Sequence, residues 1–343
     1  MTPLFLGLAG LTLTDDERAL FRAADPAGYI LFKRNVDTPE QVRALTDSLR
    51  DLAGRDDLPI LIDQEGGRVA RLQPPHWPAF PTGAAFGRLY DIAPVSALEA
   101  ARLNGLALAT MLRGLGITVD CLPLLDVPQP GAHDVIGDRA YGRDPLLVAA
   151  LGGATLAGLR QGGVVGVIKH IPGHGRAGVD SHLELPVVSA SRDELETDFI
   201  PFRKHGDAPM AMTAHVVYTA LDPVRCATLS ATVIDFIRTD LGFTGLLMSD
   251  DLGMKALGSP SQLGDNAAGS FGARATESLA AGCDIALHCS GDMAEMRAIV
   301  DAVGDIDETA AARLARAMAW AGHAEGDVAE LAAKRDALLA LAG

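Results

Sequence analysis

Short apolar runs alternate with longer helical stretches along the whole chain, and this alternation constrains the fold more than any other feature. The runs are rich in aliphatic and β-branched residues and are bounded by Gly, Pro or Asp, as buried strands are. They predict eight strands, at 4–8, 28–32, 59–62, 117–125, 164–168, 208–214, 245–248 and 284–288. Helices are predicted between them, at 39–53, 95–114, 145–161, 191–205, 230–241 and 268–281, and two more follow, at 308–322 and 327–341.

Strands that alternate with helices form right-handed βαβ units and a parallel sheet. Eight such units favour a closed (β/α)8 barrel of the TIM type over an open doubly wound sheet. No Gly/Ser linker, low-complexity tract or sharp change of composition divides the 343 residues. We therefore predict a single catalytic domain over residues 1–343, with C-terminal helices at about 307–341 packed on the barrel.

Composition and charge exclude several classes of protein. The net charge of −15 argues against a nucleic-acid partner, because binding to phosphates relies on basic surfaces. The four cysteines (Cys121, Cys226, Cys283 and Cys289) show no CxxC spacing, which is typical of core thiols in a reducing compartment. No apolar run approaches the length of a membrane span, and the first residues lack the basic start of a secretory signal. We expect a cytoplasmic monomer that binds a small molecule, contacts no membrane, and needs no metal or cofactor.

Charged side chains recur where the predicted strands end. Active sites of (β/α)8 barrels lie at the C-terminal ends of the strands, so residues from distant parts of the sequence can meet there. One such residue would be weak evidence, since strand ends border solvent, but five of the predicted units contribute. The residues are Asp63, Asp126, Lys169, His170, His215, Asp250 and Asp251.

The loop after the fifth predicted strand carries the densest chemistry. Lys-His-Ile-Pro-Gly-His-Gly at 169–175 is followed by Asp180-Ser-His182. Asp180 and His182 are two residues apart, so the carboxylate can orient the imidazole and raise its basicity. The glycines of the loop allow it to bring His182 over a pocket. A lone histidine is more often a satisfied core or surface residue, but this concentration of His, Lys and Asp favours a functional loop.

Three further positions leave two interpretations open. Of Asp250 and Asp251, one can be ionised and face the pocket while the other caps the next helix or holds a backbone N–H, or both can be caps. Asp63 and Arg71 flank a Gly-Gly turn, where they can bind sugar hydroxyls or form an ordinary ion pair. Arg139 lies in a polar loop and can point inward or into solvent.

These pieces resemble the single-domain β-N-acetylglucosaminidases of glycoside hydrolase family 3, which act in bacterial cell-wall recycling in the cytoplasm. The matching motifs occur in the family's order over about residues 1–300. They are Asp63-Gln-Glu-Gly-Gly-Arg-Val69, Gly137-Asp-Arg139, Lys169-His-Ile-Pro-Gly-His-Gly175 with Asp180-Ser-His182, Ala214-His-Val216 and Ser249-Asp-Asp-Leu252. The 169–175 loop with its Asp-Ser-His is the most specific. Ile171 departs from the family, which more often has Phe there, and the last 40 residues match no motif.

The resemblance implies a retaining exo-β-N-acetylglucosaminidase that removes terminal non-reducing N-acetylglucosamine from peptidoglycan-derived muropeptides through a covalent glycosyl-aspartate. It implies that Asp250 is the nucleophile, His182 the general acid/base and Asp180 the residue that orients His182. The implied sugar-binding residues are Asp63, Arg71, Arg139, Lys169 and His170. The chemistry is coherent, because a retaining glycosidase needs a nucleophilic carboxylate and a proton donor, and an imidazole titrates near neutral pH.

Other functions remain open on the sequence. A family 3 β-glucosidase fits the same motifs, and so does a β-N-acetylglucosaminide phosphorylase, because a His donor carries no negative charge to repel phosphate. A zinc-dependent amidohydrolase would use His170, His174, His182, His215 and Asp250 as ligands, but that class places an HxH pair after the first strand and this chain has none. A non-enzymatic sugar-binding protein gives no reason to combine Asp180, His182 and Asp250.

Overall fold

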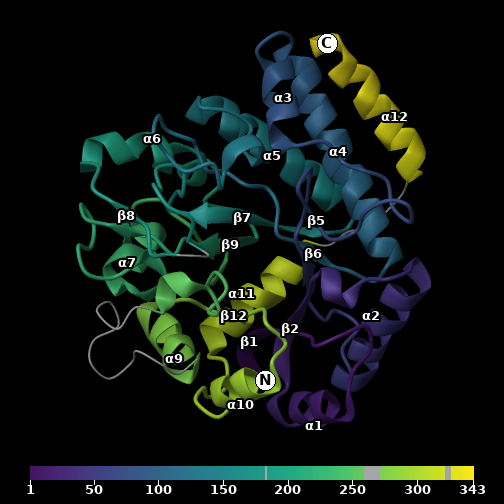
Figure 1. Ribbon diagram of the computed structural model, residues 1–343, viewed down its shortest axis with the longest axis vertical. Coiled ribbons are helices and arrows are strands. Elements are labelled where there is room, and N and C mark those ends of the chain that lie inside the picture. The colour runs from purple at the N-terminus through teal and green to yellow at the C-terminus, as the bar shows by residue number, and fades with distance from the viewer. Residues whose placement is uncertain (182–183, 259–270, 321–325) are drawn as a thin grey trace.

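Eight parallel strands form a barrel in the computed structural model, which describes residues 1–181, 184–258, 271–320 and 326–343 (Figure 1). Their order around the barrel is β11-β9-β7-β6-β3-β2-β1-β12. The strands are β1 (Thr2–Gly7), β2 (Pro26–Leu31), β3 (Ile60–Ile62), β6 (Val119–Asp120), β7 (Val165–Ile171), β9 (Met210–Thr213), β11 (Leu246–Met248) and β12 (Ala286–His288). The predicted (β/α)8 barrel is confirmed, with all eight predicted strands present.

The barrel closes at a narrow seam between β11 and β12. A single bridge pairs Met248 with Ile285, and the amide of Ser249 donates to the carbonyl of Ile285 at 3.0 Å. The fourth strand is shorter than the predicted 117–125 and ends at Asp120. Pro123 has no N–H to donate, so the ladder is interrupted there and resumes only as a bridge from Leu124 to Lys169.

Aliphatic side chains fill the barrel, and α11 (Glu308–Met318) closes its N-terminal end. Ala310, Leu314 and Ala317 recur at helical spacing and form the buried face of α11. Leu314 and Ala317 pack into the same core cluster as the inward-facing strand residues. Arg313 donates to Asp284, just before β12, at 2.7 Å, and Arg316 donates to the carbonyl of Thr244, just before β11. The helix therefore lies beneath the strands, and Figure 1 shows it across the middle of the barrel.

The other helices surround the sheet. They are α1 (Asp15–Ala24), α2 (Pro39–Ala53), α4 (Pro94–Gly114), α5 (Pro145–Gln161), α6 (Arg192–Arg203), α7 (Ala231–Thr239), α9 (Phe271–Ala281) and α10 (Met293–Val300). α2 matches its predicted bounds: Thr38 caps it, Pro39 begins it, and Gly54 ends it at φ 64°. The remaining predicted helices are present with small shifts at their ends, and 268–270 and 321–322 lie outside the described residues. No helix in the described part of the chain is both long and apolar enough to cross a membrane.

Helix α12 (Val328–Leu339) lies against α4 on the outside of the barrel (Figure 1). Its buried Arg335 donates to the side-chain oxygen of Asn104 on α4 at 3.0 Å. Both C-terminal helices therefore pack on the barrel. That residues 1–343 form a single catalytic domain stays a prediction.

Short elements decorate the loops between the barrel strands and helices. They are β4 (Gln64–Gly66), β5 (Val69–Ala70), α3 (Gly83–Tyr90), β8 (Val187–Val188), β10 (Val217–Tyr218) and the 3-10 turns η1 (Lys33–Asn35), η2 (Gly137–Arg139), η3 (Ala227–Leu229), η4 (Lys255–Leu257) and η5 (Ala340–Ala342). Except for η5 at the C-terminus, each of them follows the end of a barrel strand. They therefore build up the face of the barrel on which the active sites of (β/α)8-barrel enzymes lie.

Three helices of the structure, α1, α3 and α10, fall outside the predicted set. The start of α1 carries a capping box, in which Thr14 accepts the amide of Glu17 at 3.1 Å and Glu17 accepts the amide of Thr14 at 2.8 Å. This signal is readable from the sequence. Gly87 in α3 packs against the carbonyl of Tyr141, so that helix depends on a tertiary contact.

Candidate active site

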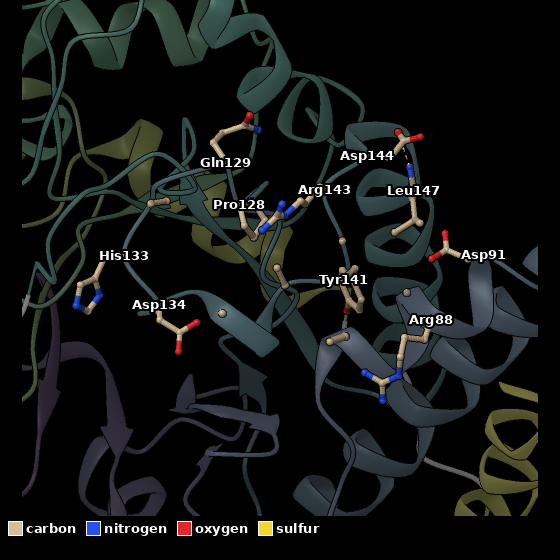
Figure 2. A pocket seen from close by; sticks show the side chains of 16 residues that line it. Arg88, Asp91, Pro128, Gln129, His133, Asp134, Tyr141, Arg143, Asp144 and Leu147 are labelled. Carbon is tan, nitrogen blue, oxygen red and sulfur yellow. Dashed lines mark hydrogen bonds between the residues drawn. The ribbon is translucent and has the colours of Figure 1, made fainter. Parts of the chain in front are cut away.

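Two of the hollows among the loops at the strand ends bear on the site. The larger has a volume of about 640 Å³ and lies between α3, the start of α5 and the segment 128–144. Figure 2 shows its charged side chains spread around the rim: Arg88 and Asp91 at α3, Asp144 at α5, and Asp134 on the loop. Asp144 caps α5 by accepting the amide of Leu146 at 2.8 Å. None of the predicted site residues that the structure describes lines this hollow.

The smaller cavity, of about 240 Å³, gathers the predicted residues. It lies at the C-terminal ends of β3, β7 and β11. Among its lining residues are the predicted Asp63, Arg71, Arg139, Lys169, His170 and Asp250. The structure also brings Glu65, His174, Ser181 and Asp251 to its wall. Asp180 directly precedes Ser181, and His182 lies outside the described residues.

A chain of alternating charges forms one side of the cavity. Lys169 is 2% exposed, and its Nζ lies 3.0 Å from Asp63 Oδ1 and 2.6 Å from Glu65 Oε1. Arg71 extends the chain at one end, 2.9 Å from Asp63. Arg139 extends it at the other, with Nη2 2.7 Å and Nε 2.9 Å from the two oxygens of Glu65. This bidentate pair points Arg139 inward, and Asp63 and Arg71 are at once an ion pair and part of the wall.

The charges hold one another in the ionised state. Burial by itself raises the pKa of Glu65, but Lys169 and Arg139 outweigh it and lower that pKa to about 2. For Asp63 burial acts in the same upward direction, and Lys169 and Arg71 lower its pKa well below the usual range. Burial would lower the pKa of Lys169, but the two carboxylates raise it. The cavity therefore offers fixed charged donors and acceptors to the hydroxyl groups of a ligand.

The hairpin of β4 and β5 places Arg71 beside Asp63. Gln64 is fully buried, and its side-chain oxygen accepts the amides of Arg71 at 2.9 Å and Leu72 at 3.0 Å. Gly66 turns the chain with φ 106°, where a Cβ would collide with the carbonyl of Pro81. The Asp-Gln-Glu-Gly-Gly-Arg motif thus folds back on itself, with Asp63 and Glu65 both toward Lys169.

Asp126 organises the start of the loop after β7. Its Oδ2 lies 2.7 Å from His170 Nδ1, and its Oδ1 accepts the amides of His170 at 3.2 Å and His174 at 2.7 Å. Burial raises the pKa of Asp126, but His170 outweighs it and lowers the value to about 2. With Nδ1 engaged by Asp126, the other ring nitrogen of His170 is the one that can meet a ligand.

The two aspartates after β11 divide their roles. Asp250 lines the cavity, and its Oδ1 accepts the amide of Asp251 at 2.7 Å. Asp251 Oδ1 accepts the amides of Gly253 at 2.9 Å and Cys289 at 3.0 Å, so this carboxylate stabilises the turn and ties it to β12. The structure therefore favours the interpretation in which one carboxylate serves the pocket and the other the backbone. Of the two roles predicted for the second carboxylate, a helix cap or a hold on backbone N–H groups, the structure shows the latter.

His215 supports that turn from below. Its Nδ1 lies 2.7 Å from the Thr228 hydroxyl, and its Nε2 lies 3.0 Å from the carbonyl of Asp251. Burial lowers the pKa of His215, which keeps the ring uncharged. Because both nitrogens bond within the protein, His215 does not serve as a zinc ligand here, and the described residues hold no group of three or more His, Cys, Asp or Glu placed to bind a metal ion.

Glu65 and Ser181 are wall residues for which the sequence predicts no role, and His174 enters the predictions only as a possible zinc ligand. Glu65 lies two residues after Asp63 in the Asp-Gln-Glu-Gly-Gly-Arg motif. In an extended segment, side chains two residues apart point to the same side. A lysine at the end of a buried strand needs buried carboxylates nearby, and this requirement is the signal that could have found Glu65.

Known proteins resemble this chain over nearly its whole length. The family model for the glycosyl hydrolase family 3 N terminal domain matches residues 6–319. Two similar relatives are both named beta-hexosaminidase. The one from Alkalilimnicola ehrlichii is 38% identical over 317 residues, which cover 92% of this chain and 88% of that protein. The one from Aromatoleum aromaticum is 39% identical over 293 residues, which cover 84% and 79%.

Solved structures agree with these relatives. NagZ from Neisseria gonorrhoeae, in complex with N-trifluoroacetyl-D-glucosamine, superposes with a TM-score of 0.85 at 32% identity, covering 100% of this chain and 98% of that one. A glycoside hydrolase family 3 beta-N-acetylglucosaminidase from Paenibacillus sp. str. FPU-7 superposes with a TM-score of 0.79 at 33% identity, covering 97% of this chain and 61% of that one. These findings confirm the resemblance inferred from the motifs. The chain belongs to glycoside hydrolase family 3 and is a glycoside hydrolase.

Proposed function

We propose that this enzyme is a retaining exo-β-N-acetylglucosaminidase that removes terminal non-reducing N-acetylglucosamine. The observation that carries the proposal is the placement of Asp250 in the wall of the same cavity as the charge chain around Lys169. At about 240 Å³ the cavity is smaller than the roughly 300–1,000 Å³ of sites for drug-sized ligands, so it suits one sugar unit at a chain end. The N-acylated glucosamine bound by the Neisseria gonorrhoeae relative supports the choice of sugar.

In the proposed reaction, Asp250 attacks the anomeric carbon and forms a glycosyl ester. The bond from that carbon to the leaving oxygen breaks, and the departing oxygen takes a proton from the protonated imidazole of His182. A water molecule then gives a proton to neutral His182, its oxygen bonds to the anomeric carbon, and Asp250 leaves as a carboxylate. Asp180 orients His182. Asp63, Arg71, Arg139, Lys169 and His170 bind the sugar hydroxyls.

The physiological part of the proposal rests on the family resemblance. We propose that the substrates are muropeptides released from peptidoglycan, and that the enzyme acts in cell-wall recycling as a cytoplasmic monomer with one catalytic domain over residues 1–343. A β-glucosidase or a phosphorylase would use the same cavity, so the sugar and the acceptor must be tested directly.

The first prediction concerns the substrate. We expect kcat/KM for an aryl β-N-acetylglucosaminide to exceed that for the matching β-glucoside by about a hundredfold or more, because a site that binds a polar group discriminates strongly against its absence. Rates are measured with both glycosides, with and without inorganic phosphate, and the anomer formed first is identified by NMR. Hydrolysis with retention supports the proposal. Formation of a sugar 1-phosphate would identify a phosphorylase, and a preference for the glucoside would identify a β-glucosidase.

The second prediction concerns His182. Replacing His182 by Ala should lower kcat/KM for aryl glycosides with poor leaving groups by about 10²–10⁴-fold, the usual contribution of a general acid. A dinitrophenyl glycoside, whose leaving group needs no proton, should keep most of its kcat/KM. Asp180→Asn serves as the companion variant and should show the same pattern in weaker form. Equal losses across the series would remove His182 from the proton-donor role.

A further inference from the structure

The loop after β7 is fixed to the barrel at its beginning. The amide of His174 donates to Asp126, and the Tyr218 hydroxyl donates to the carbonyl of Gly173 at 2.6 Å. Arg176 lies 2.6 Å from Asp198 on α6. These contacts hold 172–176, but the proposed acid/base residues come several residues later. Their placement needs a second attachment.

Ser181 provides that attachment. Its hydroxyl lies 3.1 Å from His174 Nε2, and its carbonyl accepts the amide of Ala256 at 3.2 Å. His174 and Ser181 are only 3% and 4% exposed, so solvent does not compete for the contact. Ala256 lies in η4, shortly after Asp250 and Asp251 along the chain. Ser181 is therefore joined both to the fixed start of its own loop and to the segment that carries the proposed nucleophile.

Burying the polar ring of His174 costs more folding free energy than burying an apolar ring would. Burial and the neighbouring His170 lower its pKa to about 4, so the imidazole is neutral at ordinary pH. Among the described residues its buried Nδ1 has no hydrogen-bond partner, and the contact with Ser181 is the one its side chain makes through Nε2. An unsatisfied buried nitrogen costs stability that an apolar ring would not. The hydrogen bond to Ser181 explains why a histidine occupies this position.

We propose that His174 and Ser181 are positioning residues, which set the distance of the Asp180–Ser181 segment from Asp250. The inference rests on the proposed acid/base role of the residues on either side of Ser181. Proton transfer requires hydrogen-bond reach of the leaving oxygen, and a misplacement of about 1 Å can lower a rate by about 10²-fold. Because the His174 ring is uncharged, the contact keeps its strength across neutral pH.

The test compares leaving groups in matched variants. Ser181→Ala removes the hydroxyl and should lower kcat/KM about tenfold or more for aryl β-N-acetylglucosaminides with poor leaving groups, but less than about threefold for the dinitrophenyl glycoside. Ser181→Thr restores a hydroxyl and should recover most of the loss. The control is Thr155→Val, which removes another buried hydroxyl contact, to Tyr141 at 2.8 Å, away from the loop. This control should lower kcat/KM for all substrates alike or not at all.

His174→Phe separates positioning from folding. It keeps a ring but removes the unsatisfied nitrogen, so we expect a melting temperature equal to or above that of the parent together with the same leaving-group-dependent loss as Ser181→Ala. The double variant should lose no more than either single variant, because both remove one interaction.

The outcomes are distinguishable. If His182→Ala shows no dependence on the leaving group, the proposed acid/base role fails and this inference falls with it. If His182→Ala shows the dependence but Ser181→Ala and His174→Phe behave like Thr155→Val, the proposed function stands and this inference alone is overturned. Additive losses in the double variant would also overturn it.

Discussion

Replacing Asp250 by Ala is expected to lower kcat by about 10⁴-fold or more, the order of loss seen when a catalytic nucleophile is removed. Asp250 lines the cavity directly after β11, and its Oδ1 is held by the amide of Asp251. A fixed carboxylate facing the sugar is what the proposed attack on the anomeric carbon requires. Turnover is measured with a dinitrophenyl β-N-acetylglucosaminide, so that proton donation does not limit the rate.

The Asp250 variant also allows chemical rescue. Azide is small enough to enter the space left by the carboxylate, and it should restore turnover and yield the α-glycosyl azide. Asp251→Asn is the matched control, because its side-chain oxygen can still accept the amides of Gly253 and Cys289. It should retain far more activity than Asp250→Ala. Near-normal turnover without Asp250, or equal losses in the two variants, would contradict the assignment.

Replacing Lys169 by Met should have the largest effect on stability. The change leaves the carboxylates of Asp63 and Glu65 buried without the ammonium group between them. Removing one partner of a buried ion pair typically costs about 3–5 kcal/mol of unfolding free energy. Because Arg71 and Arg139 still pair with the two carboxylates, we expect a loss near the lower end of this range. Urea denaturation measures the loss. Lys334→Met is the control, since its pair with Glu330 is exposed and should change stability by less than about 1 kcal/mol.

The Lys169 variant should also change the dependence of stability on pH. In the parent, the lowered pKa values of Asp63 and Glu65 mean that their stabilising contribution is complete above the unfolded value for Glu of about 4.3. It is lost as the pH falls toward about 2, the folded value for Glu65. Without Lys169 only Arg71 and Arg139 oppose the effect of burial, so the pKa values of Asp63 and Glu65 rise relative to the parent and the carboxylates take up protons sooner. The stability difference between parent and variant should therefore be largest near pH 7 and shrink on acidification. A gap independent of pH would show that the loss comes from packing.

Much of the site follows from the strand pattern alone. Asp63, Lys169 and Asp250 come directly after strands that alternation predicted, and a parallel barrel brings the ends of its strands to one face. The fold and the convergence of these residues were accessible because they depend on hydrophobic periodicity, which is local. The capping box of Thr14 and Glu17 was equally local and would have given α1.

The partners of the buried ion pairs could not be predicted from the local sequence pattern. Lys169 meets Glu65 and Asp63 across more than a hundred residues, and which carboxylate faces a lysine depends on the turn that Gln64 and Gly66 build. The sequence likewise left open whether Asp63 and Arg71 form an ion pair or bind sugar; in the structure they form an ion pair and both line the cavity. His174 looks like one more loop histidine until its contact with Ser181 is seen. The fourth strand was drawn too long because its apolar run continues past Pro123.

Because α11 closes the N-terminal end of the barrel, it limits how substrate can enter and product can leave. Leu314 and Ala317 pack at the far end and apolar side chains occupy the interior, so the described residues leave no passage through the barrel. A molecule that enters the cavity must therefore leave through the same opening. In the proposed exo reaction, the released monosaccharide must therefore leave through this opening before the next chain end can enter, so product exit is a step of every catalytic cycle.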